Sequence, residues 1–122
     1  MKDKLRDIAR LEHILESCRI LLSRKDSDNL DAIKNDPIKF YGYVKLIEII
    51  GEASYRLDKD FRNEHTNIPW KLMEGMRHVL VHEYYQISPE KLWITICNDI
   101  PNLTLEIKSL LSEIKGEGIN DA

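Results

Sequence analysis

The chain has 122 residues, of which 43% are hydrophobic and 32% charged, which is typical of one soluble globular domain and excludes a disordered chain. Its formal net charge of −3 excludes a broad basic surface that grips nucleic acid non-specifically, so any contact with RNA has to be local. Five glycines and four prolines are few enough to favour helices over a turn-rich β-architecture.

The first predicted element is an amphipathic helix from about Lys4 to Arg24. Its apolar residues recur every three or four positions, which is the period of a helix with one buried side. They are Leu5, Ile8, Leu11, Leu15, Cys18 and Leu22. Residues 25–35 are mostly polar, and we expect them to form either a mobile loop or a short extra helix.

The second long helix is predicted to begin with Asp36 as its N-cap and Pro37 at its first position. Its apolar stripe consists of Phe40, Val44, Ile47, Gly51 and Leu57. A glycine on such a stripe indicates that a neighbouring helix approaches closely there. A short connection over residues 58–67 leads to Pro69, which opens a third helix. The expected buried side of that helix holds Leu72, Met73, Met76 and Leu80.

The last helix is predicted to begin with Ser88 as its N-cap, followed by Pro89. Its buried side is expected to hold Leu92, Ile96, Ile100, Leu103, Ile107, Leu110 and Ile114. Pro101 lies inside this pattern, so we expect a kink or break beside Ile100. Two glycines, Gly116 and Gly118, are expected to end the helix, with a frayed tail over 116–122. The sequence therefore predicts a single all-α domain over residues 1–122, an antiparallel bundle of four or five helices.

Cys18 and Cys97 are the only cysteines, and both lie on apolar helical stripes. They could form a disulfide, but two buried thiols in a reducing compartment are favoured. The N-terminal segment leads into an amphipathic helix and does not resemble a signal peptide. No apolar run approaches the ~18 residues that a membrane span needs. We therefore expect a cytoplasmic protein that does not contact a membrane.

The segment from Arg77 to Tyr85 carries the candidate chemistry, because it places an arginine, two histidines and two tyrosines within a few helical turns. Arginine is a fixed cation that suits phosphate, and histidine exchanges a proton near neutral pH. Arg77 could stabilise charge on a phosphorane-like transition state, and His82 could take the 2′-hydroxyl proton or protonate the leaving oxygen. Tyr84 could donate to the phosphate or position the ribose. The alternative is structural: an arginine paired with a glutamate, and a histidine that caps a helix end.

Helical geometry constrains this set of residues. Arg77 and Tyr84 are seven residues apart and share a face, whereas Tyr85 is rotated by a further ~100°. His82 is five residues from Arg77, which places it roughly 140° around an ideal helix. Three arrangements could bring Arg77 and His82 together: a helix that loosens after Leu80, an arginine that reaches around it, or a second copy of the motif in a two-fold dimer.

Two further candidate roles depend on neighbours of the motif. Glu52 either pairs with Arg77 across helices or is a solvated glutamate, and the second interpretation is favoured. His78 and His82 are four residues apart with Glu74 one turn earlier, so a metal site is conceivable. No third ligand pair and no His-Glu-x-x-His order accompanies them. We therefore expect no metal and no cofactor, and we expect His78 to line the cleft or contact a second subunit.

The motif Arg77-x4-His82-x-Tyr84 resembles the Arg-x4-6-His signature of HEPN domains, and in particular the Arg-x4-His-x-Tyr form of HepT toxins. Other segments also resemble that family and extend the likeness over roughly residues 11–111. They are Ile49-Ile50-Gly51-Glu52-Ala53, Ile68-Pro69-Trp70, Gly75-Met76-Arg77, and Trp93 with Asp99-Ile100-Pro101-Asn102-Leu103. The chain departs from the usual pattern after Tyr84, where Tyr85 replaces a common phenylalanine and gives two adjacent phenols.

The resemblance implies a metal-independent RNA endonuclease toxin that acts as a homodimer, with Arg77 and His82 catalytic and the cleft at the dimer interface. It also implies a partner, a minimal nucleotidyltransferase antitoxin of the MntA type. That partner would neutralise the toxin by transferring AMP from ATP onto Tyr84, with Tyr85 as the alternative acceptor. An added phosphodiester would place charge and bulk beside Arg77 and His82 and so exclude RNA. The alternative is a non-catalytic helical subunit that binds a nucleotide or a nucleotidyltransferase partner.

Overall fold

The computed structural model describes residues 2–83 and 87–120, with side chains described for 4–77 and 87–116. All regular secondary structure in these ranges is helical, which confirms the predicted all-α class. The helices are α1 (Lys2–Lys25), α2 (Leu30–Lys34), α3 (Pro37–Tyr55), α4 (Lys59–Glu64), α5 (Trp70–Glu83), α6 (Pro89–Ile94) and α7 (Ile100–Asn120).

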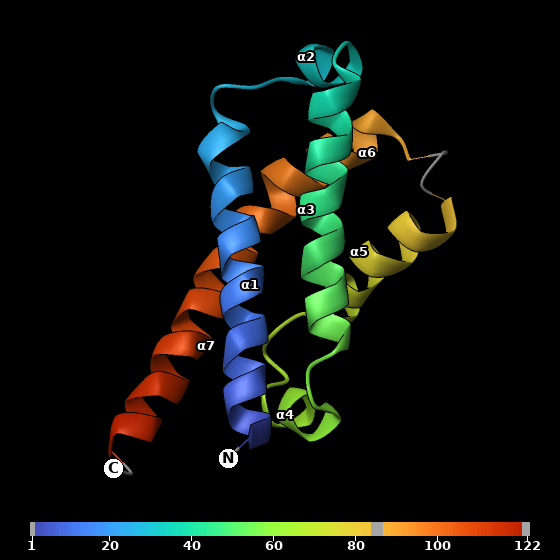
Figure 1. Cartoon of the computed structure of the whole chain (residues 1–122). Coiled ribbons are helices and arrows are strands. Elements are labelled where there is room, and N and C mark those ends of the chain that lie inside the picture. The colour runs from blue at the N-terminus through green and yellow to red at the C-terminus, as the bar shows by residue number, and fades with distance from the viewer. Residues whose placement is uncertain (1, 84–86, 121–122) are drawn as a thin grey trace.

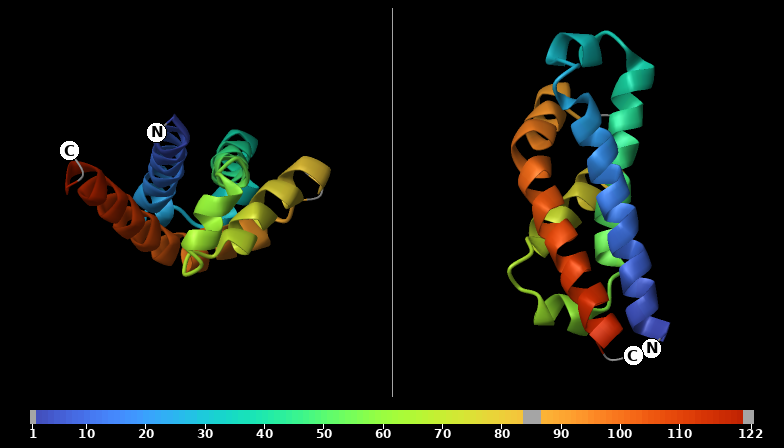
Figure 2. Two further views of the ribbon diagram at one scale, coloured as in Figure 1. Left: turned by 90° about the horizontal axis from the view of Figure 1, so that it is seen from below. Right: turned by 90° about the vertical axis from the view of Figure 1, so that its left-hand side faces the viewer.

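The long helices form the predicted bundle. Helices α1 and α3 stand side by side, and α7 packs against α1 (Figure 1). Helix α5 leans against the lower half of α3 and diverges from it, so that α5 and α7 spread outward on opposite sides of the α1–α3 pair (Figure 2). The contact between α3 and α5 is therefore where the second and third predicted long helices meet.

The core confirms most of the predicted buried positions. Every apolar position predicted for the buried side of the last helix, from Leu92 to Ile114, is buried. Two predicted positions are exposed: Leu5 in α1 at 66% and Leu72 in α5 at 43%. Ile8, Leu22 and Phe40 are only partly buried against the core, and the side chain of Leu80 lies outside the described residues. Helical spacing identifies the side of a helix that is apolar, but not how far along it a neighbour extends.

Two helix starts are confirmed together with their caps. The side chain of Asp36 accepts a hydrogen bond from the Lys39 N–H, and Pro37 opens α3. Likewise, the hydroxyl of Ser88 accepts from the Lys91 N–H, and Pro89 opens α6. In both cases an oxygen of the cap satisfies an N–H that the first turn leaves without a helical partner.

The connections contain more helix than a simple loop. Residues 25–35 include the short helix α2, which is the second of the two predicted alternatives. The connection over 58–67 contains α4, which the sequence analysis did not predict; Asp58 caps it by accepting from the Asp60 N–H. Helix α7 continues to Asn120, past Gly116 and Gly118, so the predicted end of this helix was wrong. A helical glycine costs only about 1 kcal/mol, so a glycine does not by itself end a helix.

The disturbance predicted beside Pro101 takes the form of a π-helical turn over Thr95–Asp99, between α6 and α7. The Ile100 N–H donates to the Thr95 carbonyl, five residues earlier, instead of the usual four. Proline removes a donor and crowds the preceding turn, and a π turn is one way in which a helix accommodates both effects. The bundle therefore retains one continuous apolar side through α6 and α7.

Both cysteines are free thiols, so the disulfide alternative is not realised. Cys18 is buried as predicted, and burial raises the pKa of its thiol to about 11 in spite of a hydrogen bond with Thr104. Cys97 is only partly buried. Within the described part of the chain, no helix is long and apolar enough to cross a membrane.

Candidate active site at the crossing of α3 and α5

Arg77 lies where the backbone of α5 comes close to α3, and Gly51 makes that approach possible. A Cβ atom at position 51 would lie 2.3 Å from the backbone nitrogen of Arg77 and 2.7 Å from its Cα. Real side chains do not tolerate such distances, so only glycine fits here without moving a helix. The close helix approach predicted at Gly51 is confirmed, and the residue it meets is the candidate catalytic arginine.

The side chain of Arg77 is held by two further residues of α3. Its Nε donates to Oε2 of Glu52 at 2.6 Å, and its guanidinium carbon lies 4.1 Å from the centre of the Tyr55 ring. The first contact is a charge-assisted hydrogen bond and the second a cation–π contact. Because Nε is committed to Glu52, a phosphate bound by this guanidinium would be bound through its terminal amino groups.

Glu52 is shared between two arginines. Its Oε1 accepts from Nε of Arg56 at 2.9 Å, while Oε2 accepts from Arg77. The hydrogen bond from Arg56, followed by that from Arg77, holds the pKa of the Glu52 carboxyl below its usual range, so the group is ionised at neutral pH. The sequence alone favours a solvated glutamate, whereas the structure forms the Glu52–Arg77 pair, the less favoured alternative.

His82 follows Arg77 on the same uninterrupted helix, because α5 extends from Trp70 to Glu83. The proposed loosening after Leu80 is therefore not present, and the five-residue spacing retains its offset of roughly 140°. The side chains of His78 and His82 lie outside the described residues, as do Tyr84 and Tyr85 altogether. The structure thus brings Arg77 and Glu52 together, while the roles of the other motif residues remain predictions.

Tyr55 is the residue of this site that the sequence analysis missed. It lies on α3 four residues after Gly51 and three after Glu52, so all three share one side of the helix. A tyrosine four residues after Gly51 would predict a contact with Arg77 only if it were already known that α5 crosses α3 at Gly51. The 52% exposure of Tyr55 confirms that its ring belongs to the surface and not to the core.

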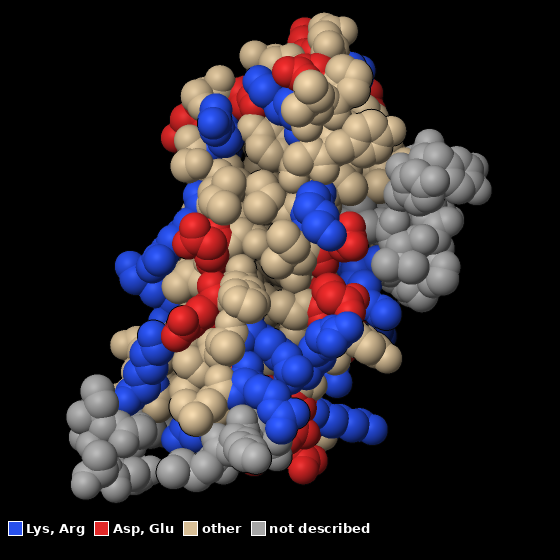
Figure 3. Space-filling view, viewed as in Figure 1, with Lys and Arg blue, Asp and Glu red and all other residues tan. Residues whose placement is uncertain are grey.

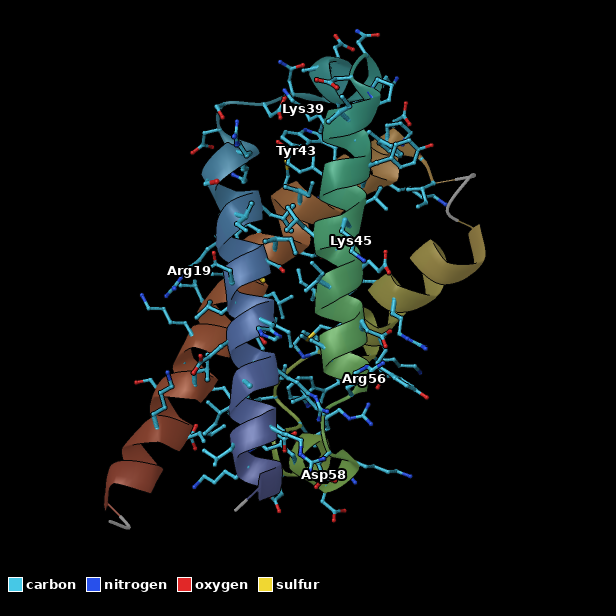
Figure 4. The ribbon with its side chains drawn as sticks, viewed as in Figure 1. Arg19, Lys39, Tyr43, Lys45, Arg56 and Asp58 are labelled. Carbon is cyan, nitrogen blue, oxygen red and sulfur yellow. The ribbon has the colours of Figure 1, made fainter. Side chains whose placement is uncertain are left out.

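Two hollows are bordered by Arg56, the arginine that shares Glu52 with Arg77. One, of about 220 Å3, is lined by His13, Lys45, Glu48, Ile49, Glu52, Ala53 and Arg56. The other, of about 360 Å3, is lined by Arg6, Asp7, Arg10, Arg56 and Asp58. Arg56 borders both hollows, and Figure 4 shows it at the lower end of α3, above Asp58.

Comparison with known proteins identifies the family. The family model described as ribonuclease HepT-like matches residues 11–110. A protein of Caldanaerobacter subterraneus subsp. tengcongensis named "Putative RNase" is 39% identical over 105 residues, covering 86% of this chain and 94% of that protein. A Methanocaldococcus jannaschii protein of the same description is 39% identical over 84% of this chain and 95% of its own length.

A protein of Thermococcus cleftensis named "Probable ribonuclease HepT" is 33% identical over 109 residues, covering 89% of this chain and 94% of that protein. None of the solved structures matches the chain. The family match spans the helix that carries Gly51 and Glu52 as well as the one that carries Arg77. The chain belongs to the HepT-like ribonuclease family.

Proposed function

We propose that the protein is a metal-independent RNA endonuclease, the toxin of a HEPN and nucleotidyltransferase toxin–antitoxin pair. The observation that carries this proposal is the fixed guanidinium of Arg77, held by Glu52 and Tyr55 on the helix that continues to His82. A cation fixed in advance stabilises developing charge without reorganising during the reaction. A purely structural arginine would not need a motif histidine on the same helix.

In the proposed reaction, the 2′-oxygen of a ribose forms a bond to the adjacent phosphorus, and the bond from phosphorus to the 5′-oxygen of the next nucleotide breaks. His82 accepts the 2′-hydroxyl proton and, in the imidazolium form that results, donates a proton to the leaving oxygen. Arg77 stabilises the charge on the phosphorane-like transition state through its terminal amino groups. The products are a 2′,3′-cyclic phosphate and a free 5′-hydroxyl.

The proposed unit is a two-fold homodimer, because one helix places His82 roughly 140° from Arg77. Packing two copies of α5 against each other would surround one cleft with two Arg77–His82 sets. In this arrangement His78 lines the cleft or contacts the second subunit, and Glu52 keeps each guanidinium in position.

The activity is tested with purified protein, a single-stranded RNA and EDTA. Cleavage should persist in EDTA, and Arg77→Ala and His82→Ala should each lower the rate by ~10²–10⁴, as expected for loss of a transition-state contact or a general acid–base group. Arg19→Ala, which removes an exposed arginine of α1, is the matched control and should retain the rate. Cleavage that requires added metal would contradict the proposed mechanism.

The proposed antitoxin is an MntA-type minimal nucleotidyltransferase that transfers AMP onto Tyr84. Incubation with a nucleotidyltransferase encoded by a neighbouring gene and ATP should add the mass of one or more AMP units to the peptide that contains Tyr84. Tyr84→Phe should resist modification and escape neutralisation, because the added negative charge no longer reaches the Arg77 site. Modification that instead requires Tyr85 would assign the acceptor to the second phenol.

A further inference from the structure

Three arginines surround a second polar hollow next to the Arg77 site. The hollow of about 360 Å3 lies between the first turns of α1 and the end of α3, and all its lining residues are charged: Arg6, Asp7, Arg10, Arg56 and Asp58. Lysine and arginine side chains gather over this lower part of the face in Figure 3. Three arginines and two aspartates line the hollow, so its lining carries a formal charge of +1 in a chain of net charge −3.

The two carboxylates of this hollow have structural partners. Asp7 is 4% exposed; its Oδ1 accepts from the Asp58 N–H at 3.2 Å and lies 3.8 Å from Nη1 of Arg10. Asp58 caps α4 by accepting from the Asp60 N–H. Both acids therefore hold the chain between α3 and α4 in place, and Asp7 also pairs with Arg10.

Two of the three arginines of the hollow are linked to Arg77 indirectly, Arg56 through Glu52 and Arg10 through the backbone of Arg56. Glu52 accepts from Arg77 through one oxygen and from Arg56 through the other, so these two guanidinium groups lie on the two sides of one carboxylate. Arg10 in turn donates from Nη1 to the carbonyl oxygen of Arg56 at 2.5 Å. An extended anion that binds at Arg77 and leaves toward the lower end of α3 would next meet Arg56 and then Arg10.

We propose that Arg6, Arg10 and Arg56 form a second phosphate subsite, which takes a neighbouring phosphate of the RNA strand whose scissile phosphate lies at Arg77. This inference rests on the proposed ribonuclease function. Contacts of arginine to backbone phosphates position a strand without reading its sequence. The subsite thus supplies the local RNA contact that the acidic chain as a whole cannot provide.

The test uses a short single-stranded RNA whose 2′-hydroxyls are all methylated, so that it binds without being cleaved. Affinity is measured at several KCl concentrations for the unmodified protein, Arg6→Gln, Arg10→Gln and Arg19→Gln. Arg6→Gln and Arg10→Gln should each weaken binding about tenfold at low salt, as for loss of one charge-assisted contact. Each should also reduce the slope of log affinity against log salt by about 0.7.

Arg19→Gln is the matched control, because it removes the same charge from the same helix. Arg19 lies higher on α1 and points away from α3 in Figure 4. Its affinity and salt slope should match those of the unmodified protein. Equal losses in all three variants would show a general effect of net charge and overturn the subsite, as would unchanged binding in Arg6→Gln and Arg10→Gln.

Cleavage assays separate this inference from the proposed function. With an unmodified dinucleotide and a longer RNA as substrates, Arg6→Gln and Arg10→Gln should lower the rate on the longer RNA more than that on the dinucleotide. Equal losses on both substrates would mean that the arginines act through Arg77 and would overturn the subsite. If the unmodified protein cleaves neither RNA, the proposed function itself fails. Thermal melting shows whether each variant is folded. If Arg10→Gln is unstable, Arg6→Gln still tests the subsite, because Arg6 is at an exposed position.

Discussion

The guanidinium of Arg77 is held on two sides, by the charge of Glu52 and by the ring of Tyr55. A lysine at this position could pair with Glu52 or contact the ring, but its ammonium group lacks the planar fork of donors that would face a phosphate at the same time. The geometry implies that Tyr55 positions Arg77 without itself touching the reacting atoms. An exposed tyrosine here could either position the arginine or stack on a nucleobase. Loss of the first role would lower kcat, whereas loss of the second would raise KM.

Tyr55→Leu should lower kcat for RNA cleavage about two- to fivefold, because an exposed cation–π contact contributes roughly 0.5–1 kcal/mol. Tyr55→Phe retains the ring and should retain kcat. Tyr41→Leu is a matched control, since Tyr41 is a similarly exposed tyrosine of α3 at 53%. Steady-state kinetics with a defined RNA measure both constants. A rise in KM alone would indicate stacking on a base and contradict the positioning role.

The ion pair of Glu52 should make stability depend on pH in a defined direction. The hydrogen bonds from Arg56 and Arg77 lower the pKa of Glu52 in the folded chain below its ordinary value of 4.5. The stabilisation of the fold by ionised Glu52 is therefore complete above pH 4.5. It is lost as the pH falls through the lowered pKa of the folded state. Thermal melting of Glu52→Gln against the unmodified protein should show a difference that shrinks on acidification. A difference that grows toward acid pH would contradict this sign.

Between elements, the crossing of α3 and α5 depends on the absence of a side chain at one position. Gly51→Ala places a methyl group within 2.3 Å of the Arg77 backbone and should destabilise the fold by ~1–3 kcal/mol, as overpacking does. Gly42→Ala, in the same helix, has nothing within 4 Å of its new methyl and should stabilise the fold by up to ~1 kcal/mol. Urea unfolding measures both, and equal signs would refute the close-approach argument.

Helix starts could be predicted from the sequence, whereas contacts between helices could not. Asp36 with Pro37, and Ser88 with Pro89, specify helix starts through local hydrogen bonds, and both were predicted correctly. Gly51 indicated a close approach, but the sequence did not say to which residue. Leu5 and Leu72 were misassigned, and Tyr55 was missed, because burial and ring contacts at these positions depend on where a neighbouring helix ends or crosses. Local chemistry was readable, whereas the placement of helices relative to each other was not.

In the whole molecule, the proposed homodimer would share its active site between two subunits. Arg77→Ala and His82→Ala, each inactive alone, should be mixed under conditions that exchange subunits. If the site combines Arg77 of one subunit with His82 of its partner, mixed dimers contain one intact site, and the mixture should recover about a quarter of full activity. Light scattering measures the oligomeric state in parallel. No recovery despite proven exchange would place both residues of a working site on one subunit.

The first turn of α1 and the last turn of α7 lie at the same end of the bundle, beside α4 (Figures 1 and 2). A domain fused to either terminus would therefore be attached at that end, which also holds the hollow lined by Arg6, Arg10 and Arg56. A bulky or charged purification tag at the N-terminus would be tethered a few residues from Arg6. Joining the two ends through a linker and opening the chain elsewhere, for example in the connection between α2 and α3, would remove both free ends from this region.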